Sequence, residues 1–281
     1  MSQGPRRPRK VSSATASRVV RLTPDMVRVF FTGDDLRALP ELIYTDHYIK
    51  ILFPPEGAGY SWPFDNDAIR QTRPAEEWPV TRTYTIRSYD PETNEMAVDF
   101  VVHGDEGLAG PWAAEVAPGA SIGFFGPGGG YAPDPEADVH LFVGDEAAIP
   151  AIAAALDRLP EEAEAQVVLE VANSDHHQPL GGTSRTQVTW VHRDELGLPY
   201  GEALTREVQS RALPAGRIDA FVHGNAEMVK ALRRFLFVDQ RVDRRRVSIS
   251  GYWRTGHTED RWQATKGEFN ASMEAEEAVS G

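Results

Sequence analysis

The chain has 281 residues, with 29 Lys or Arg against 42 Asp or Glu, so that its formal net charge is −13. General electrostatic binding to nucleic acid or to an anionic membrane is therefore not expected. Because cysteine is absent, disulfides, thiol catalysis and Cys-ligated metal or iron–sulfur centres are excluded. The chain shows neither an apolar stretch that could span a membrane nor a secretory signal, and we expect a monomeric cytoplasmic protein.

The first half of the chain predicts a closed antiparallel β-barrel of six strands. Thr23-Pro24-Asp25 marks a hairpin turn between the first two strands. A short helix is expected near Pro111, because proline suits the first turn of a helix. The six β-rich runs cover residues 17–22, 27–32, 47–53, 80–87, 96–102 and 121–125.

The second half alternates between strands and helices, which predicts a doubly wound parallel α/β sheet. Strands are expected at 139–143, 166–171, 187–191, 218–223 and 247–249, and helices at 149–159, 201–212 and 226–238. A Gly-Pro-Gly-Gly-Gly run at 126–130 separates the two halves. We therefore predict a disordered basic tail over 1–10, a barrel domain over 11–130, an α/β domain over 131–256 and a partly disordered C-terminal segment over 257–281.

Two barrel motifs have the chemistry of a dinucleotide site. On the strand Arg82-Thr83-Tyr84-Thr85-Ile86-Arg87, Arg82 and Tyr84 share one face, while Thr83 and Thr85 share the other. An Arg can pair with a diphosphate, and a Tyr can lie against a flat ring. The stretch Asp99-Phe100-Val101-Val102-His103-Gly104 leads through a glycine-punctuated loop to a helix start, where backbone N–H groups favour an anion. Taken alone, each motif also fits an ordinary strand or turn.

Three motifs of the second half follow predicted strands. Gly144-Asp145-Glu146-Ala147 and Gly224-Asn225-Ala226 come at the carboxyl edge of the sheet, where nucleotides usually bind. Neither contains G-x-G-x-x-G, so the signal is positional. Tyr252-Trp253-Arg254 follows the last strand and could cover a flat ring. His176-His177 lies in a polar loop with no third ligand near in sequence, and we expect no metal site.

In their order along the chain, these motifs resemble the siderophore-interacting proteins, the FAD-dependent ferric-siderophore reductases of the ferredoxin-reductase-like superfamily. The resemblance spans residues 11–256, and it also includes Trp112-Ala113 and the Ala148 and Pro150 that follow Gly144. It implies a barrel that binds FAD and an α/β domain that binds NAD(P)H. It further implies that a ferric siderophore accepts the electrons and releases Fe(II) for iron assimilation.

The resemblance implies roles for particular residues, while the flavin carries the redox chemistry and no side chain is catalytic. Lys50 and Arg254 are expected to offer positive charge to an anionic siderophore. For NAD(P)H the expected residues are Gly144, Asp145, Glu146, Ala147, Gly224, Asn225 and Ala226. For FAD they are Arg82, Thr83, Tyr84, Thr85, Phe100, Val101, Val102, His103, Gly107, Ala109, Gly110, Trp112 and Trp253.

The chain departs from the family pattern at three places. Gly107-Leu108-Ala109-Gly110 stands where the family commonly has Gly-Pro-Ala-Ser, Ala147 replaces a Thr, and Asn225 replaces a Glu. The segment 172–175 after the second predicted strand of the sheet has no basic residue, which favours NADH over NADPH, with a ferredoxin as another donor. The alternatives to a ferric-siderophore reductase are a flavin-dependent reductase with another acceptor and a non-catalytic siderophore-binding protein.

Overall fold

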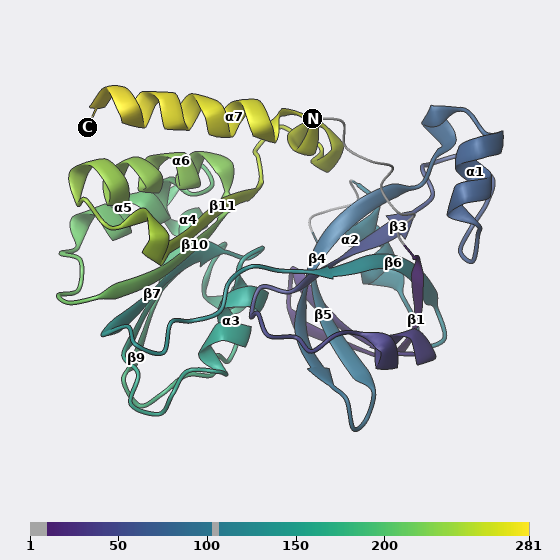
Figure 1. Ribbon diagram of the computed structural model, residues 1–281, viewed down its shortest axis with the longest axis horizontal. Helices are drawn as coiled ribbons and strands as arrows, with labels where there is room; N and C mark the ends of the chain where they lie inside the picture. Colours follow the sequence, from purple (N-terminus) through teal and green to yellow (C-terminus); the bar gives the residue numbers. More distant parts are fainter. Residues whose placement is uncertain (1–9, 103–106, 281) are drawn as a thin grey trace, which may run out of the picture. The chain divides into compact units, whose positions relative to one another are not determined.

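The structure is a computed structural model that describes residues 10–102 and 107–280 (Figure 1). It divides into two compact units. Unit 1 comprises Met1–Leu22, Met26–Ile43 and His47–Gly130, and unit 2 comprises Thr23–Asp25, Tyr44–Asp46 and Tyr131–Gly281. Except for Lys10, the predicted basic tail lies outside the described residues, and so do His103 and Gly104. The predicted bounds of the two domains stay predictions.

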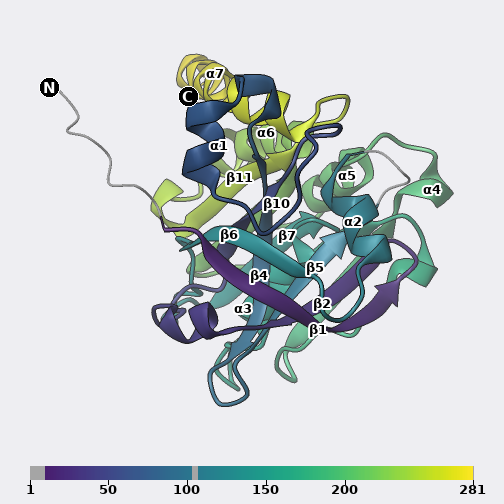
Figure 2. The ribbon, with the colours of Figure 1, turned by 90° about the vertical axis from the view of Figure 1, so that its right-hand side faces the viewer.

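Unit 1 is the predicted closed barrel of six antiparallel strands, with neighbours in the order β1-β2-β5-β4-β3-β6. Figure 2 shows β1 and β6 side by side in the barrel wall. The strands are β1 (Ser12–Thr23), β2 (Met26–Thr32), β3 (Tyr48–Phe53), β4 (Val80–Asp90), β5 (Glu95–Val101) and β6 (Ser121–Gly128). The helices are η1 (Asp34–Ala38), α1 (Asn66–Thr72), η2 (Ala75–Glu77) and α2 (Ala109–Glu115), of which α2 contains Pro111 as expected.

Alternating apolar side chains fill the barrel. On β3, Ile49 and Ile51 are fully buried in the core, so that Tyr48 and Lys50, which alternate with them, point to the outer face. Burial of one such Ile contributes about 1.5–3 kcal/mol to folding. The alternation therefore fixes which face of the barrel each polar side chain occupies.

Unit 2 is a parallel sheet of five strands in the order β11-β10-β7-β8-β9, which confirms the predicted fold class. The strands are β7 (Val139–Asp145), β8 (Ala165–Val171), β9 (Thr186–His192), β10 (Ile218–Asn225) and β11 (Val247–Trp253). The other elements are α3 (Ile149–Leu156), η3 (Ser174–His176), α4 (Arg193–Leu196), α5 (Glu202–Ser210), α6 (Ala226–Arg234), a π-helical turn η4 (Phe235–Asp239), η5 (Arg244–Arg246) and α7 (Glu259–Ser280).

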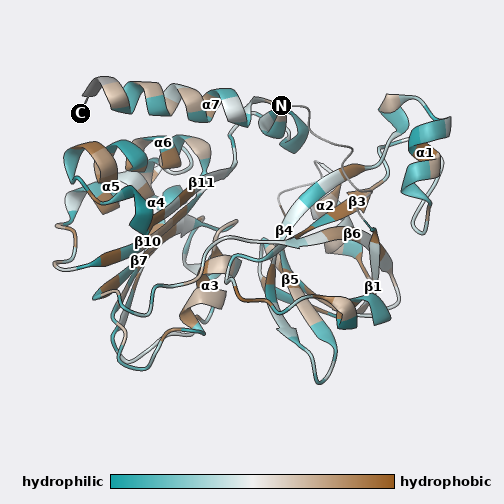
Figure 3. Ribbon diagram, viewed as in Figure 1, coloured by the Kyte–Doolittle hydropathy of each residue, from teal (hydrophilic) through white to brown (hydrophobic). Residues whose placement is uncertain are grey.

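Helices cover both faces of this sheet. Side chains of α5 and α6 pack with Leu141 and Val143 of β7 in one apolar cluster, and α3 packs with Phe142 of the same strand in another. Every residue of β7 is consequently buried, as in parallel sheets in general. Figure 3 shows hydrophobic residues concentrated on the strands of both units.

The C-terminal segment differs from the expected partial disorder, because α7 is a helix of 22 residues. Trp262 near its start is 1% exposed and packs beside Gly251 of β11. Toward its end, Glu277 lies 2.7 Å from both Arg233 and Arg244. The Glu- and Ala-rich composition favoured fraying, but these tertiary contacts stabilise a helix whose own sequence is mostly polar.

Candidate functional site

The two candidate motifs of the barrel meet around three aromatic rings. The ring of Tyr84 on β4 lies 4.4 Å from that of Phe100 on β5, measured between centroids. The ring of Phe100 lies 5.6 Å from the indole of Trp112 on α2. Trp112 also packs against Phe31 and Phe53 of the core. The packing thus brings β4, β5 and the start of α2 to one place in unit 1.

The side chains gathered there differ in what they offer a ligand. Phe100 is fully buried and Thr85 is 8% exposed, so neither side chain is open to a ligand. Thr83 is exposed, and Arg82 and Tyr84 are half-buried. The guanidinium of Arg82 and the half-buried phenol ring of Tyr84 share one face of β4 and fit FAD, because its diphosphate needs a cation and its ring a flat partner. The hydroxyl of Thr83 lies on the other face of β4, opposite Lys50 in the strand register.

The start of α2 adds backbone groups to this set. Gly107 has φ +84°, a left-handed conformation that favours glycine, and an added Cβ there would meet nothing within 4 Å. Within the part of the chain that the structure describes, no side chain caps the first turn of α2. Gly110 and Trp112 are half-buried and Ala109 is buried, and Val101 and Val102 at the end of β5 are half-buried. The N–H groups of this turn therefore have no side-chain acceptor among the described residues.

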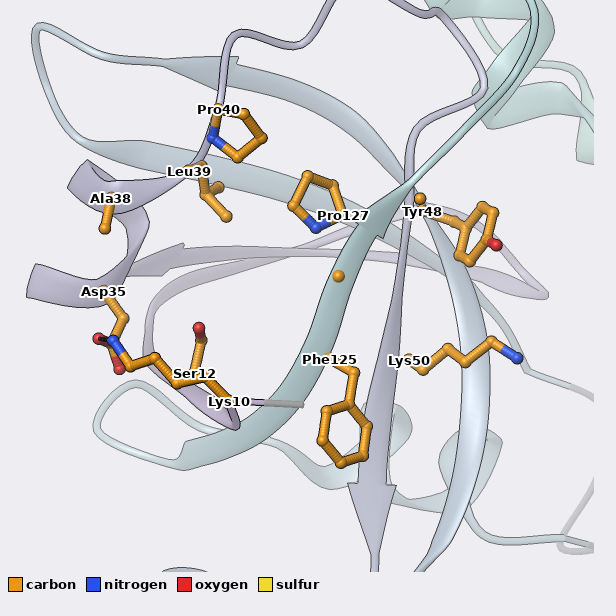
Figure 4. A pocket seen from close by; sticks show the side chains of 12 residues that line it. Lys10, Ser12, Asp35, Ala38, Leu39, Pro40, Tyr48, Lys50, Phe125 and Pro127 are labelled. Atoms are coloured by element: carbon orange, nitrogen blue, oxygen red, sulfur yellow. Dashed lines mark hydrogen bonds and ion pairs between the residues drawn. The ribbon is translucent and has the colours of Figure 1, made fainter. Parts of the chain in front are cut away.

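Lys50 lines an open cavity of about 520 Å³ on the barrel. Its partners in the strand register are Thr83 on β4 and Phe125 on β6, so it stands beside the Arg82–Arg87 strand. Figure 4 shows Lys50 on one side of β6 and the ion pair of Lys10 and Asp35 on the other. Lys50 has no hydrogen-bond or ion-pair partner among residues 10–102 and 107–280, which leaves its charge available to a ligand.

In unit 2, the carboxylate of Asp145 joins the ends of three strands. Its Oδ2 accepts hydrogen bonds from Asn225 N at 2.7 Å and from Trp253 Nε1 at 2.8 Å, and its Oδ1 accepts one from Ala147 N at 3.0 Å. Burial, and then the charge of Glu146, raise the pKa of Asp145 to about 7, although its hydrogen bonds act in the opposite direction. Asp145 therefore connects β7, β10 and β11 from inside the protein.

Glu146 is also committed to a partner. Its Oε1 lies 2.5 Å from Arg193 Nη1, and both side chains are less than 10% exposed. Burial raises the pKa of Glu146, while Arg193 lowers it. The guanidinium of Arg193 also lies 4.3 Å from the ring centroid of Tyr200. These two predicted nucleotide residues, Asp145 and Glu146, use their carboxylates within the protein.

The remaining residues predicted for NAD(P)H shape the same sheet edge. Asn225 accepts hydrogen bonds from the N–H groups of Glu227 and Met228 and is the N-cap of α6, a position that favours Asn. Gly224 has φ +136°, and a Cβ there would lie 2.6 Å from the Asp145 carboxylate. Gly144 and Ala226 are buried, and Ala147 is half-buried.

The predicted Trp253 and Arg254 are both held by neighbours within unit 2. Besides its bond to Asp145, the indole of Trp253 makes an edge contact with the Tyr200 ring at 5.1 Å. The guanidinium of Arg254 lies 2.8 Å from Glu227 and 4.6 Å from the ring centroid of Phe269 on α7. Arg254 thus shares its charge with a carboxylate, whereas Lys50 has no such partner in the described ranges.

Two findings concern other kinds of site. In the described ranges, no group of three or more His, Asp or Glu side chains is placed to hold a metal ion. No helix in these ranges is long and apolar enough to cross a bilayer.

The sequence matches two family models. Residues 15–131 match the siderophore-interacting FAD-binding domain, and residues 137–256 match the siderophore-interacting protein model. The chain belongs to the siderophore-interacting protein family. The FAD-binding model covers the residues that meet around Tyr84, so the family assignment and the geometry of the barrel site agree.

Relatives in this family cover most of the chain. It is 40% identical to the uncharacterized protein Rv2895c of Mycobacterium tuberculosis, over 88% of this chain and 92% of that one. It is 33% identical to the ferric vibriobactin reductase ViuB of Vibrio cholerae, over 85% and 88%. It is 27% identical to the NADPH-dependent ferric-chelate reductase of Escherichia coli, over 90% and 99%. The crystal structure of a siderophore utilization protein from T. fusca is similar with a TM-score of 0.78 and 32% identity, over 90% and 96%.

Sequence reasoning missed the residues that hold the unit 2 edge together. Arg193 begins α4 and Tyr200 lies between α4 and α5, in a stretch with no recognisable motif, yet they complete the environment of Glu146 and Trp253. Glu170 is likewise buried and accepts hydrogen bonds from Gly201 N and Leu204 N, which caps α5. The only sequence signal was a charged residue inside an apolar strand, which indicates an internal partner without naming it.

Proposed function

We propose that the protein reduces a ferric siderophore, with FAD bound to the barrel and NAD(P)H as electron donor, and releases iron as Fe(II). The observation that carries the proposal is the meeting of Arg82–Thr85, β5 and α2 around the rings of Tyr84 and Trp112. The names of two relatives, a ferric vibriobactin reductase and an NADPH-dependent ferric-chelate reductase, support this class of reaction.

The residues of unit 1 bind and orient. When bound, FAD would supply the conversion between a two-electron donor and a one-electron acceptor. Arg82 would pair with the diphosphate, Tyr84 would lie against the isoalloxazine ring, and the Thr83 hydroxyl and the α2 N–H groups would offer hydrogen bonds. We propose no side chain as acid, base or nucleophile, because electron transfer to Fe(III) needs none.

We propose that Lys50 attracts the anionic ferric chelate. The formal net charge of −13 repels anions, so a local cation is needed. Lys50 lines a cavity and has no partner among the described residues. Arg254 has a smaller proposed role, because a chelate would compete with Glu227 for it.

For the donor, we propose that NAD(P)H binds at the carboxyl ends of β7 and β10. We propose that three residues of this edge support its backbone and do not touch the nucleotide, because hydrogen bonds within the protein occupy their polar atoms. They are Asp145, Glu146 and Asn225. Half-buried Ala147 is the residue of the first motif that a nucleotide could reach.

The test is an anaerobic visible spectrum of the purified protein supplemented with FAD. NADH or NADPH is added while the oxidised flavin band is followed, and a ferric catecholate or hydroxamate is then added with an Fe(II) trap. Bleaching by either nucleotide, followed by reoxidation and trapped Fe(II), is the expected result. Because the two nucleotides are added separately, the same experiment identifies the preferred donor.

Other outcomes separate the alternatives. If only reduced ferredoxin bleaches the flavin and Fe(II) is still released, the protein is a ferric-siderophore reductase whose electron donor is ferredoxin and not NAD(P)H. Bleaching without Fe(II) from any ferric chelate would indicate a flavin-dependent reductase with another acceptor. Failure to retain FAD would overturn the proposal and favour a siderophore-binding protein without redox activity.

A further inference from the structure

Two histidines at the carboxyl ends of β8 and β9 have no role in the proposed function. His177 directly follows η3, and His192 is the last residue of β9. Their Nε2 atoms lie 2.7 Å apart. Two facing ring nitrogens at this distance share one hydrogen: one donates an N–H and the other accepts it with its lone pair.

Neighbouring side chains hold both rings in this orientation. Nδ1 of His192 lies 2.9 Å from Oε1 of Glu195, which assigns a hydrogen to Nδ1 and leaves the lone pair on Nε2, so His177 Nε2 is the donor between the two rings. The ring of His177 stacks on the indole of Trp190, with centroids 4.4 Å apart and planes 18° apart. A histidine whose second nitrogen donates to a carboxylate is the usual arrangement of a metal-ligating histidine.

We propose that His177 and His192 bind a divalent first-row transition-metal ion through their Nε2 atoms, with water completing the coordination. Imidazole nitrogen suits Zn²⁺, Ni²⁺ and Fe²⁺. Metal–nitrogen bonds of about 2.0–2.1 Å place two nitrogen ligands roughly 3 Å apart. The ring centroids lie 5.0 Å apart, so the two Nε2 atoms point at each other in the structure. To bind an ion, both rings must turn as well as separate slightly, and His177 must carry its hydrogen on Nδ1 so that the ion replaces the shared hydrogen. His177 is exposed and the His192 side chain is 21% exposed, so an ion can reach the pair.

A phosphate group is the competing ligand, because nucleotides bind along this edge of parallel sheets. The carboxylate of Glu195 argues against it, since a negative charge in contact with His192 repels a phosphate and attracts a cation. His176 is not part of the site, because its Nδ1 lies 3.0 Å from Asn173 Oδ1. The sequence alone showed only the adjacent pair His176-His177, and the fold supplies His192 as the partner.

Fe²⁺ belongs to the proposed class of ions and is the product of the proposed reductase reaction. This link rests on the proposed function, but the site itself does not. Binding is therefore measured with metal alone, on protein given neither electron donor nor ferric chelate. A failure of metal binding and a failure of reduction are then separate results.

The experiment is isothermal titration of Ni²⁺ into the full chain with any affinity tag removed. We expect saturable binding of one ion per chain. His192→Gln and His177→Gln should abolish it, and Glu195→Gln should weaken it by about tenfold or more, the usual effect of removing a carboxylate behind a ligand. His176→Gln is the matched control and should bind as the unaltered protein does. Thermal unfolding of each variant checks that it folds.

Several results would overturn the proposal. One is no saturable binding to the unaltered protein, and another is equal binding to His192→Gln, which would indicate adventitious sites elsewhere. A third is a loss in His176→Gln as large as in His177→Gln. Binding of inorganic phosphate or 2′-phospho-AMP that His192→Gln abolishes, without binding of Ni²⁺, would make the pair an anion site instead.

Discussion

The barrel and the α/β unit use the polar residues of their motifs in opposite ways. On the barrel, Thr83 is exposed and Lys50 lines a cavity without a partner among the described residues. At the sheet edge of unit 2, Asp145, Glu146 and Asn225 are at most 3% exposed and bind other protein groups. A motif that follows a strand therefore indicates where a ligand could bind. Its side chains, however, either remain available to that ligand or are used in hydrogen bonds and ion pairs within the protein.

The strongest test of this contrast breaks the buried pair of unit 2. Arg193→Met leaves the Glu146 carboxylate buried without its cation, and we expect a loss of about 3–5 kcal/mol in the free energy of unfolding, measured with urea. Arg206→Met is the control, because Arg206 pairs with Glu202 on the exposed face of α5 and should cost under about 1 kcal/mol. The double variant Glu146→Gln with Arg193→Met should recover much of the loss. If Arg193→Met and Arg206→Met lower the free energy of unfolding equally, the buried Glu146–Arg193 pair does not have the proposed structural role.

The next test uses the pKa of Asp145, which burial and Glu146 raise to about 7 from an unfolded value of about 3.9. Between these pH values the folded protein keeps a proton that the unfolded chain has lost. The free energy of unfolding therefore falls as pH rises toward 7, by up to roughly 1.4 kcal/mol per pH unit, and levels off above it.

The measurement is the difference between unaltered protein and Asp145→Asn in urea unfolding from about pH 5 to about pH 8. The difference is needed because burial lowers the pKa of His223 to about 3, and this group makes stability rise with pH between about 3 and 6.5. Asn at position 145 cannot ionise. The difference in the free energy of unfolding between the unaltered protein and Asp145→Asn should therefore change with pH, by up to roughly 1.4 kcal/mol per pH unit below pH 7. Parallel curves would show that Asp145 titrates normally and does not join the strand ends as a buried acid.

On the barrel, the contrast predicts a loss of binding without a loss of stability. Arg82→Ala should weaken FAD binding by about tenfold or more, since a hydrogen bond to a charged group contributes about 1.5–3 kcal/mol. Quenching of FAD fluorescence measures the affinity. Arg18→Ala on β1 is the control, because Arg18 pairs with Glu95 and lies over Phe30. If both variants retain FAD equally, the Arg82–Arg87 strand is not the flavin cradle.

The smallest expected effect concerns the substrate. Lys50→Ala should raise the KM for an anionic ferric chelate by about two- to fivefold with little change in kcat, because exposed charge pairs contribute about 0.2–1 kcal/mol. Lys50→Arg should restore the KM, and Arg254→Ala should change it less than Lys50→Ala does. If Arg254→Ala raises the KM more than Lys50→Ala does, the chelate displaces Glu227 from Arg254, and Arg254 is the main cation for the substrate.

Much of the fold could be predicted because it depends on local patterns. Alternation of apolar residues gave the six barrel strands, and the fully apolar run of β7 gave a strand covered on both faces. Segments stabilised by distant partners were missed. Helix α1 lies in a stretch without clear periodicity, and α7 depends on Trp262 and Glu277 contacting residues of β11, α6 and η5.

The candidate site divides in the same way. The motifs at strand ends located the candidate sites of the barrel and of the parallel sheet, because the order of strands and helices along the chain shows where each strand ends. Whether a carboxylate there meets a ligand or an arginine depends on a residue far away, as with Glu146 and Arg193. The pair of His177 and His192 is a second case, since β8 and β9 must lie in parallel before these imidazoles face each other.

By itself, the sequence determined the barrel, the parallel sheet, the family resemblance and the residue types available for a flavin, because periodicity and motif order are properties of the chain. Only the tertiary structure decided which charges are buried, that Lys50 has no partner within the described part of the chain, and which histidines meet. The physical reason is that burial and pairing depend on distances between residues far apart in the chain, and those distances exist only after the sheet and barrel have closed.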